Sequence, residues 1–309
     1  MIEVENLSKR YGEKLAVDGL DFVVRPGTVT GFLGPNGAGK STTMRMIAGL
    51  DEPTAGRVRV NGRDYRAASA PMAELGMLLE ARAVHTGRSA RNHLLALAQT
   101  NGISRRRVDA VIGMAGLDDV AGKRVGGFSL GMGQRLGIAS ALLGDPGVVV
   151  LDEPVNGLDP EGVLWVRNLL KGLAGEGRTV FVSSHLMSEM ALTATRLVVV
   201  GRGRLIADTT VEEFTARAGD DAVTVRTPQA ARLRELLLGP DITVTSEQAG
   251  VLHVQGMSAE QVGVTAWQAR LPVFELTTTH ASLEEAFMQL TEDSVDFRSH
   301  VAAEAVAVR

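Results

Sequence analysis

The fold of this chain is decided by the stretch Gly34-Pro35-Asn36-Gly37-Ala38-Gly39-Lys40-Ser41-Thr42. Its spacing is that of a phosphate loop, in which a glycine is followed by four residues and then by Gly-Lys-Ser. An apolar segment (29–33) precedes it and a helical pattern (42–50) follows it, which is the context that such a loop needs. Loop amides and the positive end of the helix would surround the phosphates of a nucleotide.

Two side chains of this stretch have chemical roles of their own. The Lys40 ammonium would reach the β- and γ-phosphates, and the Ser41 hydroxyl would ligate Mg²⁺. We therefore expect Gly34 to Thr42 to bind a nucleoside triphosphate with Mg²⁺. The alternative is a glycine-rich turn that binds nothing.

The composition is that of an ordinary globular protein. The 309 residues are 45% hydrophobic and 22% charged, and the length is sufficient for two domains. The absence of cysteine excludes disulfides, thiolate metal sites and cysteine nucleophiles, and it agrees with a reducing cytosol. A formal net charge of -4 provides no electrostatic reason to expect a nucleic acid as partner.

The sequence contains no apolar run that approaches the roughly 18 residues of a membrane span. The N-terminal residues, with Glu3 and Glu5 close behind Met1, lack the charge and the apolar core of a signal peptide. We expect a soluble, cytoplasmic protein. Any work at a membrane would then require a separate chain that spans it.

The N-terminal part predicts a small antiparallel sheet beside the phosphate loop. Strand patterns begin at Ile2 and Phe22, and a third includes Val58 and ends at the pair Asn61-Gly62, which is a strong signal for a hairpin turn. We expect this sheet to belong to the same domain as the loop.

The rest of the first domain predicts an α/β fold with a P-loop NTPase core. Short apolar or β-branched runs at 148–151, 179–183 and 197–200 are separated by helical patterns, which is typical of parallel strands covered on both faces. The pattern between about 84 and 143 is helical and predicts a helical insertion. We expect this domain to span residues 2–217.

A second, smaller domain is expected at 218–291, followed by a loosely ordered tail at 292–309. Its predicted order of elements, β-α-β-β-α-β, suggests a ferredoxin-like α+β appendage. One helix is expected from Thr227 to Leu238 with Pro228 at its first position. Capping boxes are expected at the helices that begin after Thr210 and Ser258, and the last helix has a similar Ser-x-x-Glu start.

Carboxylates follow the apolar run at 148–151. Asp152, at the strand end, would hold Mg²⁺ through water, and Glu153 would polarise the attacking water. His185 follows the next apolar strand, at the carboxyl end of a parallel strand where ligands bind. Isolated residues of these types are more often helix caps or structural groups, but their order after a phosphate loop favours catalysis.

A further motif, Phe128-Ser129-Leu130-Gly131-Met132-Gly133-Gln134-Arg135, opens a helix between the loop and the carboxylates. Ser129 is the expected N-cap, so this helix would present its positive end to an anion.

These motifs, together with Leu158-Asp159, closely resemble the ATP-binding cassette (ABC) family over residues 2 to 217. The resemblance implies an ATPase in which two cassettes pair head to tail, and each ATP lies between the phosphate loop of one and the signature helix of the other. It implies ATP contacts for Ser129, Gly131 and Asp159, and γ-phosphate stabilisation by Lys40 and His185. Tyr11 is similar in position to the aromatic residue that stacks on adenine, although a tyrosine at a strand edge is the plainer interpretation.

The chain departs from the family at the signature and at the glutamine that links Mg²⁺ to the membrane partner. The family usually has Leu-Ser-Gly-Gly-Gln at the signature, of which Ser129 and Gly131 are kept. The position of the linking glutamine is occupied by Glu80. We hypothesise that Glu80 replaces it as a Mg²⁺ ligand, against the alternative of an exposed acid at a strand end.

The variant signature and the segment 282–287 resemble the drug- and bacitracin-export branch of the family. This implies a homodimeric ATPase, peripheral on the inner face of the cell membrane, that powers export through a separate permease of the ABC-2 type, with ATP and Mg²⁺ and no nucleic acid. The alternatives are a soluble ABC-family ATPase that is not coupled to a permease, and a regulatory ATP-binding module without catalysis. Neither the transported substrate nor the role of the C-terminal appendage follows from the sequence.

Overall fold

The computed structural model describes residues 1–80, 83–216, 222–246, 248–279 and 282–291. Within these ranges the chain forms two compact units, Met1–Asp208 and Thr209–Leu290. The expected boundary between residues 217 and 218 and the expected tail 292–309 lie outside the described residues.

The centre of the first unit is a mainly parallel sheet with the strand order β5-β6-β7-β3-β8-β9. Its strands are β3 (Val29–Leu33), β5 (Leu75–Leu78), β6 (Val148–Leu151), β7 (Thr179–Ser183), β8 (Arg196–Gly201) and β9 (Arg204–Thr210). The pairs β5–β6, β6–β7, β3–β7 and β3–β8 are parallel, which confirms the prediction from the apolar runs. Every residue of β3, β6 and β7 is buried, as expected for strands covered on both faces.

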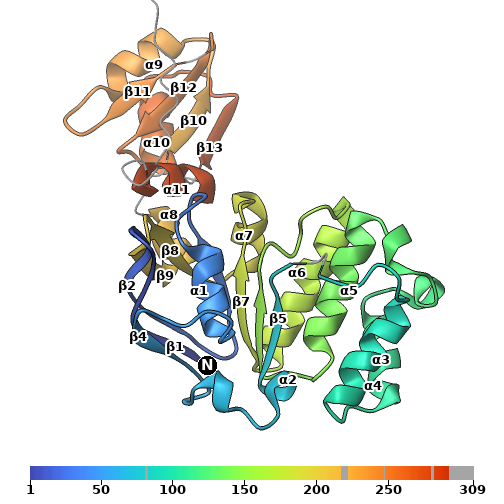
Figure 1. Ribbon diagram of the computed structural model, residues 1–309. Helices are drawn as coiled ribbons and strands as arrows, with labels where there is room; N and C mark the ends of the chain where they lie inside the picture. Colours follow the sequence, from blue (N-terminus) through green and yellow to red (C-terminus); the bar gives the residue numbers. More distant parts are fainter. Residues whose placement is uncertain (81–82, 217–221, 247, 280–281, 292–309) are drawn as a thin grey trace, which may run out of the picture. The chain divides into compact units, whose positions relative to one another are not determined.

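Helices cover this sheet and form a separate layer beyond it (Figure 1). They are α1 (Lys40–Ile47), α2 (Pro71–Glu74), α3 (Ala90–Thr100), α4 (Arg105–Met114), α5 (Leu130–Leu142), α6 (Pro160–Gly175), α7 (Met187–Thr193) and the one-turn helices η1 (Tyr65–Ala67), η2 (Asp118–Val120) and η3 (Val125–Gly127). Helices α3, α4 and α5 pack on one another, and α5 also packs on β5 and β6. These three helices lie within the range in which a helical insertion was expected.

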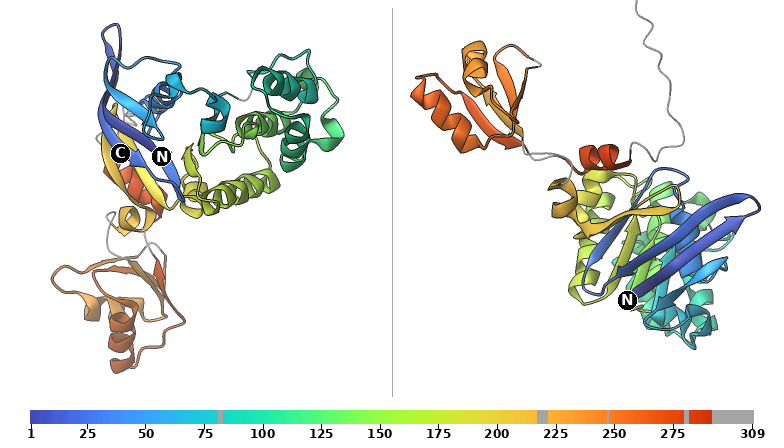
Figure 2. Two further views of the ribbon diagram at one scale, coloured as in Figure 1. Left: turned by 90° about the horizontal axis from the view of Figure 1, so that it is seen from below. Right: turned by 90° about the vertical axis from the view of Figure 1, so that its left-hand side faces the viewer.

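A second sheet of the first unit has the order β2-β1-β4 and is antiparallel. Its strands are β1 (Ile2–Tyr11), β2 (Lys14–Val24) and β4 (Ala55–Val60), of which β1 and β2 form the long ribbon coloured blue in Figure 2. Asn61 and Gly62 form a turn with positive φ of 51° and 80°. That turn closes only the bridge between Val60 and Arg63, so the expected hairpin is limited to one residue pair, and β4 instead pairs with β1.

A cluster of phenylalanines joins the two sheets of the first unit. The ring centroids of Phe22, Phe32 and Phe181 lie 4.9–5.9 Å from one another. All three side chains are buried, and burying a side chain of this size contributes about 1.5–3 kcal/mol. Strands β3 and β7, which lead to the phosphate loop and to His185, are therefore anchored in a packed core.

The second unit contains an antiparallel sheet with the order β11-β12-β10-β13. Its elements are α8 (Val211–Ala216), β10 (Ala222–Arg226), α9 (Ala230–Leu237), β11 (Thr243–Thr245), β12 (Val251–Gln255), α10 (Ala259–Gln268), β13 (Glu275–Thr279) and α11 (Leu283–Thr291). Apolar residues of the sheet and of α9 and α10 form its core.

Local signals place most helix starts in this unit. The capping box at Ser258 is present, and reciprocal hydrogen bonds join Thr210 to Glu213 and Ser282 to Glu285.

The expected start of α9 was wrong, because the helix begins at Ala230. The Thr227 hydroxyl accepts the N–H of Gln229 at 3.2 Å, and this local turn delays the helix.

Candidate active site

The phosphate loop connects β3 to α1, as the sequence predicts. A Cβ on Gly34 would lie 2.4 Å from the carbonyl oxygen of Val200, so only glycine fits there. Gly39 is the N-cap of α1, with a φ of 96° in the left-handed region, and no side chain caps the helix. The first turn of α1 therefore keeps its N–H groups for an anion.

A cavity of about 420 Å³ opens at this loop. It is lined by Tyr11, Lys14, Ala16, Asn36, Gly37, Ala38, Gly39, Lys40, Ser41, Thr42, Asp152 and Glu153. The structure thus places the expected aromatic residue, most of the phosphate loop and both carboxylates around one space.

The Lys40 ammonium lies inside the loop. It donates hydrogen bonds to the carbonyl oxygens of Gly34 at 2.6 Å and Pro35 at 3.2 Å. Burial lowers the pKa of Lys40, while the nearby carboxylates of Glu153 and Asp152 act in the opposite direction. The loop carbonyl oxygens therefore hold the ammonium group, and the charges of Glu153 and Asp152 favour its protonated form.

The hydroxyl of Ser41 and the carboxylate of Asp152 meet although 111 positions separate them in the chain. Ser41 Oγ donates to Asp152 Oδ2 at 2.8 Å, and Ser183 Oγ donates to Asp152 Oδ1 at 2.5 Å. This donor set of hydroxyl and carboxylate oxygens suits Mg²⁺. Ser183 is fully buried, so it holds the carboxylate from the side of β7.

Glu153 and His185 also lie together. His185 Nδ1 is 2.7 Å from Glu153 Oε2, and the backbone N–H of His185 donates to the same oxygen at 3.3 Å. The N–H of Glu153 donates to Ser183 Oγ at 2.9 Å. The expected base therefore lies next to the expected histidine, at the carboxyl ends of β6 and β7.

The signature residues lie outside the residues that line the loop cavity. Ser129 is the N-cap of α5 and accepts the N–H of Met132 at 3.2 Å, which confirms the expected cap. Asp159 caps α6 by accepting the N–H of Gly162 at 2.9 Å. Gly131 lies beside the turn that precedes Asp159, because a Cβ on it would approach the carbonyl oxygen of Gly157 to 3.2 Å.

Glu80 lines a different cavity, of about 470 Å³. Residues of α1, β5, α3 and α5 also line it, among them Arg45, His93 and Ser140, and so do Leu79 and Val84 from the loop after β5. Burial lowers the pKa of His93, and the charge of Arg88 acts in the same direction. Ser41 and Asp152 line the loop cavity instead, so the expected metal ligands are divided between two cavities.

Comparison with known proteins assigns the family. Residues 17–156 match the family described as ABC transporter, and residues 221–284 match a domain family of unknown function. The daunorubicin resistance ATP-binding protein DrrA3 of Streptomyces coeruleorubidus is 35% identical over 303 residues, which cover 94% of this chain and 96% of that protein. The chain belongs to the ABC transporter ATP-binding proteins.

Other members of the family are similar as well. The bacitracin transport ATP-binding protein BcrA of Bacillus licheniformis is 40% identical over 211 residues, which cover 67% of this chain and 69% of that protein. The dimeric structure of a bacterial ABC transporter cassette has a TM-score of 0.63 and 26% identity, covering 68% of this chain and 98% of that one. This ABC protein is an ATPase with the P-loop fold of its family. No helix in its described ranges is long and apolar enough to cross a membrane.

A network that the sequence motifs did not indicate orients the aromatic side chain of this ABC cassette. Tyr11 donates its hydroxyl proton to Asp51 Oδ2 at 2.7 Å, and Arg45 Nε donates to the same oxygen at 2.9 Å. The hydrogen bonds from Arg45 and then from Tyr11 lower the pKa of Asp51 to about 2. Asp51 follows α1 in a loop without a motif, so only the fold reveals its place.

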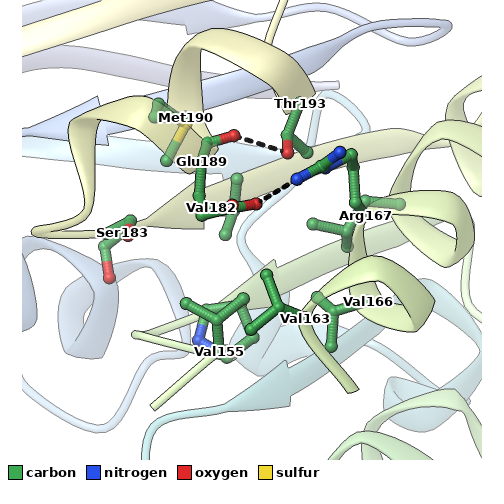
Figure 3. A pocket seen from close by; sticks show the side chains of 12 residues that line it. Val155, Val163, Val166, Arg167, Val182, Ser183, Glu189, Met190 and Thr193 are labelled. Carbon is green, nitrogen blue, oxygen red and sulfur yellow. Dashed lines mark hydrogen bonds and ion pairs between the residues drawn. The ribbon is translucent and has the colours of Figure 1, made fainter. Parts of the chain in front are cut away.

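A small cavity lies between α6, α7 and the end of β7 (Figure 3). Its volume is about 20 Å³, and valines of the loop and of α6, Val155, Val163 and Val166, line one side. On the other side Arg167 reaches from α6 to Glu189 of α7 at 2.6 Å. This half-buried ion pair ties the helix that Asp159 begins to the helix that follows His185.

Proposed function

We propose that this chain is the ATP-hydrolysing subunit of an ABC exporter, that it works as a homodimer, and that it powers a separate ABC-2 type permease. Its place would be the cytoplasm, peripheral on the inner face of the membrane. Two relatives, a bacitracin transport ATP-binding protein and a daunorubicin resistance ATP-binding protein, support a drug, antibiotic or lipid-like molecule as the cargo.

The loop and the β6 carboxylates would act together on ATP. Lys40 would neutralise charge on the β- and γ-phosphates, and His185 would support the γ-phosphate from the opposite side. Ser41 and Asp152 would hold Mg²⁺, which supplies further neutralisation of phosphate charge when bound. Glu153 would orient the attacking water and accept its proton.

The signature helix would complete the site of a second copy. Ser129 and the backbone N–H of Gly131 stand at the first turn of α5, where the helix dipole favours an anion. Asp159 would contact the nucleotide or its partner cassette from the start of α6. These residues lie apart from the loop cavity of their own chain, which supports a head-to-tail dimer with two shared sites.

Two further regions would complete the subunit. Tyr11 would stack on adenine, with its ring oriented by Asp51. The cavity that Glu80 lines, between the central sheet and the α3–α5 layer, would receive a helix of the permease and pass motion to it. Glu80 would also ligate Mg²⁺. Because Glu80 and Ser41 line different cavities, this role would require Glu80 to approach Ser41 when the metal binds.

We also propose a ferredoxin-like fold for the second unit. Two observations support it, the element order β10-α9-β11-β12-α10-β13 and the antiparallel strand order β11-β12-β10-β13. The domain family that matches residues 221–284 has no known function, and the role of this unit stays open.

The observation that carries the proposed activity is the meeting of Lys40, Ser41, Asp152 and Glu153 at one cavity. Glu153→Gln keeps the shape of the side chain but removes the base. We expect it to leave ATP affinity intact and to reduce steady-state phosphate release at least about 100-fold. The matched control is Glu161→Gln, which removes an exposed carboxylate in the first turn of α6 and should keep normal turnover.

Coupling to a permease is tested separately. A tagged chain, purified from detergent-solubilised membranes, should retain a polytopic protein whose presence changes the ATPase rate. Recovery of the chain without such a protein would favour the soluble, uncoupled ATPase. Normal phosphate release by Glu153→Gln would refute the assignment of the base.

A further inference from the structure

The backbone of Glu153 has an unfavourable conformation. Its φ is 50°, in the left-handed region that residues other than glycine seldom adopt. Such a conformation costs free energy and persists only where the surrounding structure holds it. The backbone conformation of Glu153 sets the direction of its carboxylate. The groups that hydrogen-bond to Glu153 therefore help to orient the expected base.

Glu153 is held from three directions. Ser183 Oγ accepts its N–H at 2.9 Å, and His185 Nδ1 lies 2.7 Å from its carboxylate. Its carbonyl oxygen accepts the side-chain amide of Gln134, Nε2, at 3.0 Å and the N–H of Asn156 at 3.2 Å. Ser183 and His185 come from the neighbouring strand and its following loop, whereas Gln134 comes from the signature helix α5.

Gln134 is a buried polar side chain, only 4% exposed, on an otherwise apolar face of α5. Burial of an amide is costly unless it is hydrogen-bonded, and the amide group finds the Glu153 carbonyl. Gln134 lies little more than one turn after Ser129, which is the N-cap of the same helix.

A second contact joins α5 to the same segment. Gly157, with a φ of 73°, lies against Leu130, because a Cβ on it would come within 2.1 Å of Leu130 Cδ2. The first two turns of α5 thus touch the segment from Glu153 to Gly157 at both of its ends. A displacement of α5 would be transmitted to the peptide of Glu153.

We propose that Gln134 is the positioning residue for Glu153, and that it links the signature helix to the orientation of the base within the same chain. The inference rests on the proposed role of Glu153 as the base. Gln134 would touch neither ATP nor water, and it would act only by holding the left-handed peptide. In a dimer, α5 of one chain would contact the nucleotide bound to the other chain. That contact would thereby also secure Glu153 of the chain that contributes α5.

The first test uses Gln134→Met in the full-length purified chain. Methionine has a similar length and suits a buried position, but it cannot donate a hydrogen bond. We expect kcat for ATP to fall about tenfold, with KM and ATP affinity unchanged, because only the base is misplaced. The control is Ile138→Val, one turn further along α5 and 1% exposed, which should lower Tm slightly and leave kcat unchanged.

The second test uses Gln134→Glu and the pH profile. A protonated glutamic acid can donate to the Glu153 carbonyl, whereas an ionised one cannot, and burial raises the pKa of such a carboxyl. The ratio of its kcat to that of the unmodified chain should therefore rise as pH is lowered from 8 to 6. The ratio cancels the titration of groups that both proteins share, and a purely structural role would leave it constant.

The outcomes separate the two proposals. If Glu153→Gln abolishes turnover but Gln134→Met retains full kcat, the role of Gln134 is refuted and the base assignment stands. If Gln134→Met is too unstable for assay, a pH-independent ratio for Gln134→Glu refutes the role. If Glu153→Gln hydrolyses ATP normally, both proposals fall together.

Discussion

Ser183→Ala is the sharpest test of how this site is built. The hydroxyl of Ser183 is fully buried at the end of β7 and serves both carboxylate residues of the site. It donates to Asp152 Oδ1 at 2.5 Å and accepts the N–H of Glu153 at 2.9 Å. Alanine removes a single oxygen atom, so the substitution leaves a part-buried N–H without this partner and a carboxylate with one hydrogen bond fewer.

The size of the effect follows from these two contacts. An unsatisfied buried N–H costs about 1–3 kcal/mol, and a hydrogen bond to a charged group contributes about 1.5–3 kcal/mol. Because the two contacts share one hydroxyl, we expect a total loss of about 2–4 kcal/mol in the free energy of unfolding. For a domain of the size of the first unit this corresponds to a Tm lower by about 5–15 °C. Turnover should fall about 10- to 100-fold, since Asp152 and Glu153 both lose a constraint.

Thr179→Val is the matched control on the same strand. Thr179 is 1% exposed, and among the described residues its Oγ1 finds no hydrogen-bond partner. Replacing that hydroxyl by a methyl group should therefore leave Tm unchanged or raise it, with normal turnover. Differential scanning calorimetry and a phosphate-release assay measure both quantities. Equal Tm shifts for the two variants would refute the argument, because the two hydroxyls would then contribute alike.

Two further predictions concern Asp51 and Glu80. The stability that Asp51 gains from Arg45 and Tyr11 is fully present above its unfolded pKa of 3.8 and is lost as pH falls through the folded value of about 2. The destabilisation by Asp51→Asn, measured by urea unfolding, should therefore be constant between pH 7 and 5 and shrink below pH 4, and a constant difference down to pH 2.5 would contradict this network. If Glu80 is a Mg²⁺ ligand as proposed, Glu80→Gln should raise the Mg²⁺ concentration for half-maximal ATPase about threefold, because that ligand loses its negative charge. An unchanged Mg²⁺ titration would remove Glu80 from the metal site and leave it to the second cavity.

Much of this fold could be predicted because its signals are local. The phosphate loop and the apolar runs of β6, β7 and β8 are read within a few residues, and so are the caps at Ser129 and Ser258. The sequence pattern predicted the wrong local structure where a short-range contact competes with it. The hydroxyl of Thr227 delays the start of α9, and the turn at Asn61-Gly62 is closed by a single bridge between the residues that flank it.

The sequence predicted which residues belong to the candidate site better than it predicted which of them contact one another. Motif order placed Lys40, Asp152, Glu153 and His185 in one site, but it did not reveal Gln134 as a partner of Glu153. The helical periodicity of the sequence could have predicted that Gln134 is buried, since it lies four positions before the apolar residue Ile138 on the same helix face. The pattern marks such a residue as a buried polar group, but it cannot name its partner.

By itself the sequence determined the class of chemistry, because a phosphate loop needs its glycines, lysine and serine as direct neighbours in the chain. Only the tertiary structure decided which groups hold the base and the aromatic ring. Ser41 meets Asp152 across 111 positions, and Tyr11 meets Asp51 across 40, through hydrogen bonds that exist only when strands and helices have packed. A hydrogen bond depends on distances of a few ångströms, and in a folded chain the packing of the core sets these distances between remote segments.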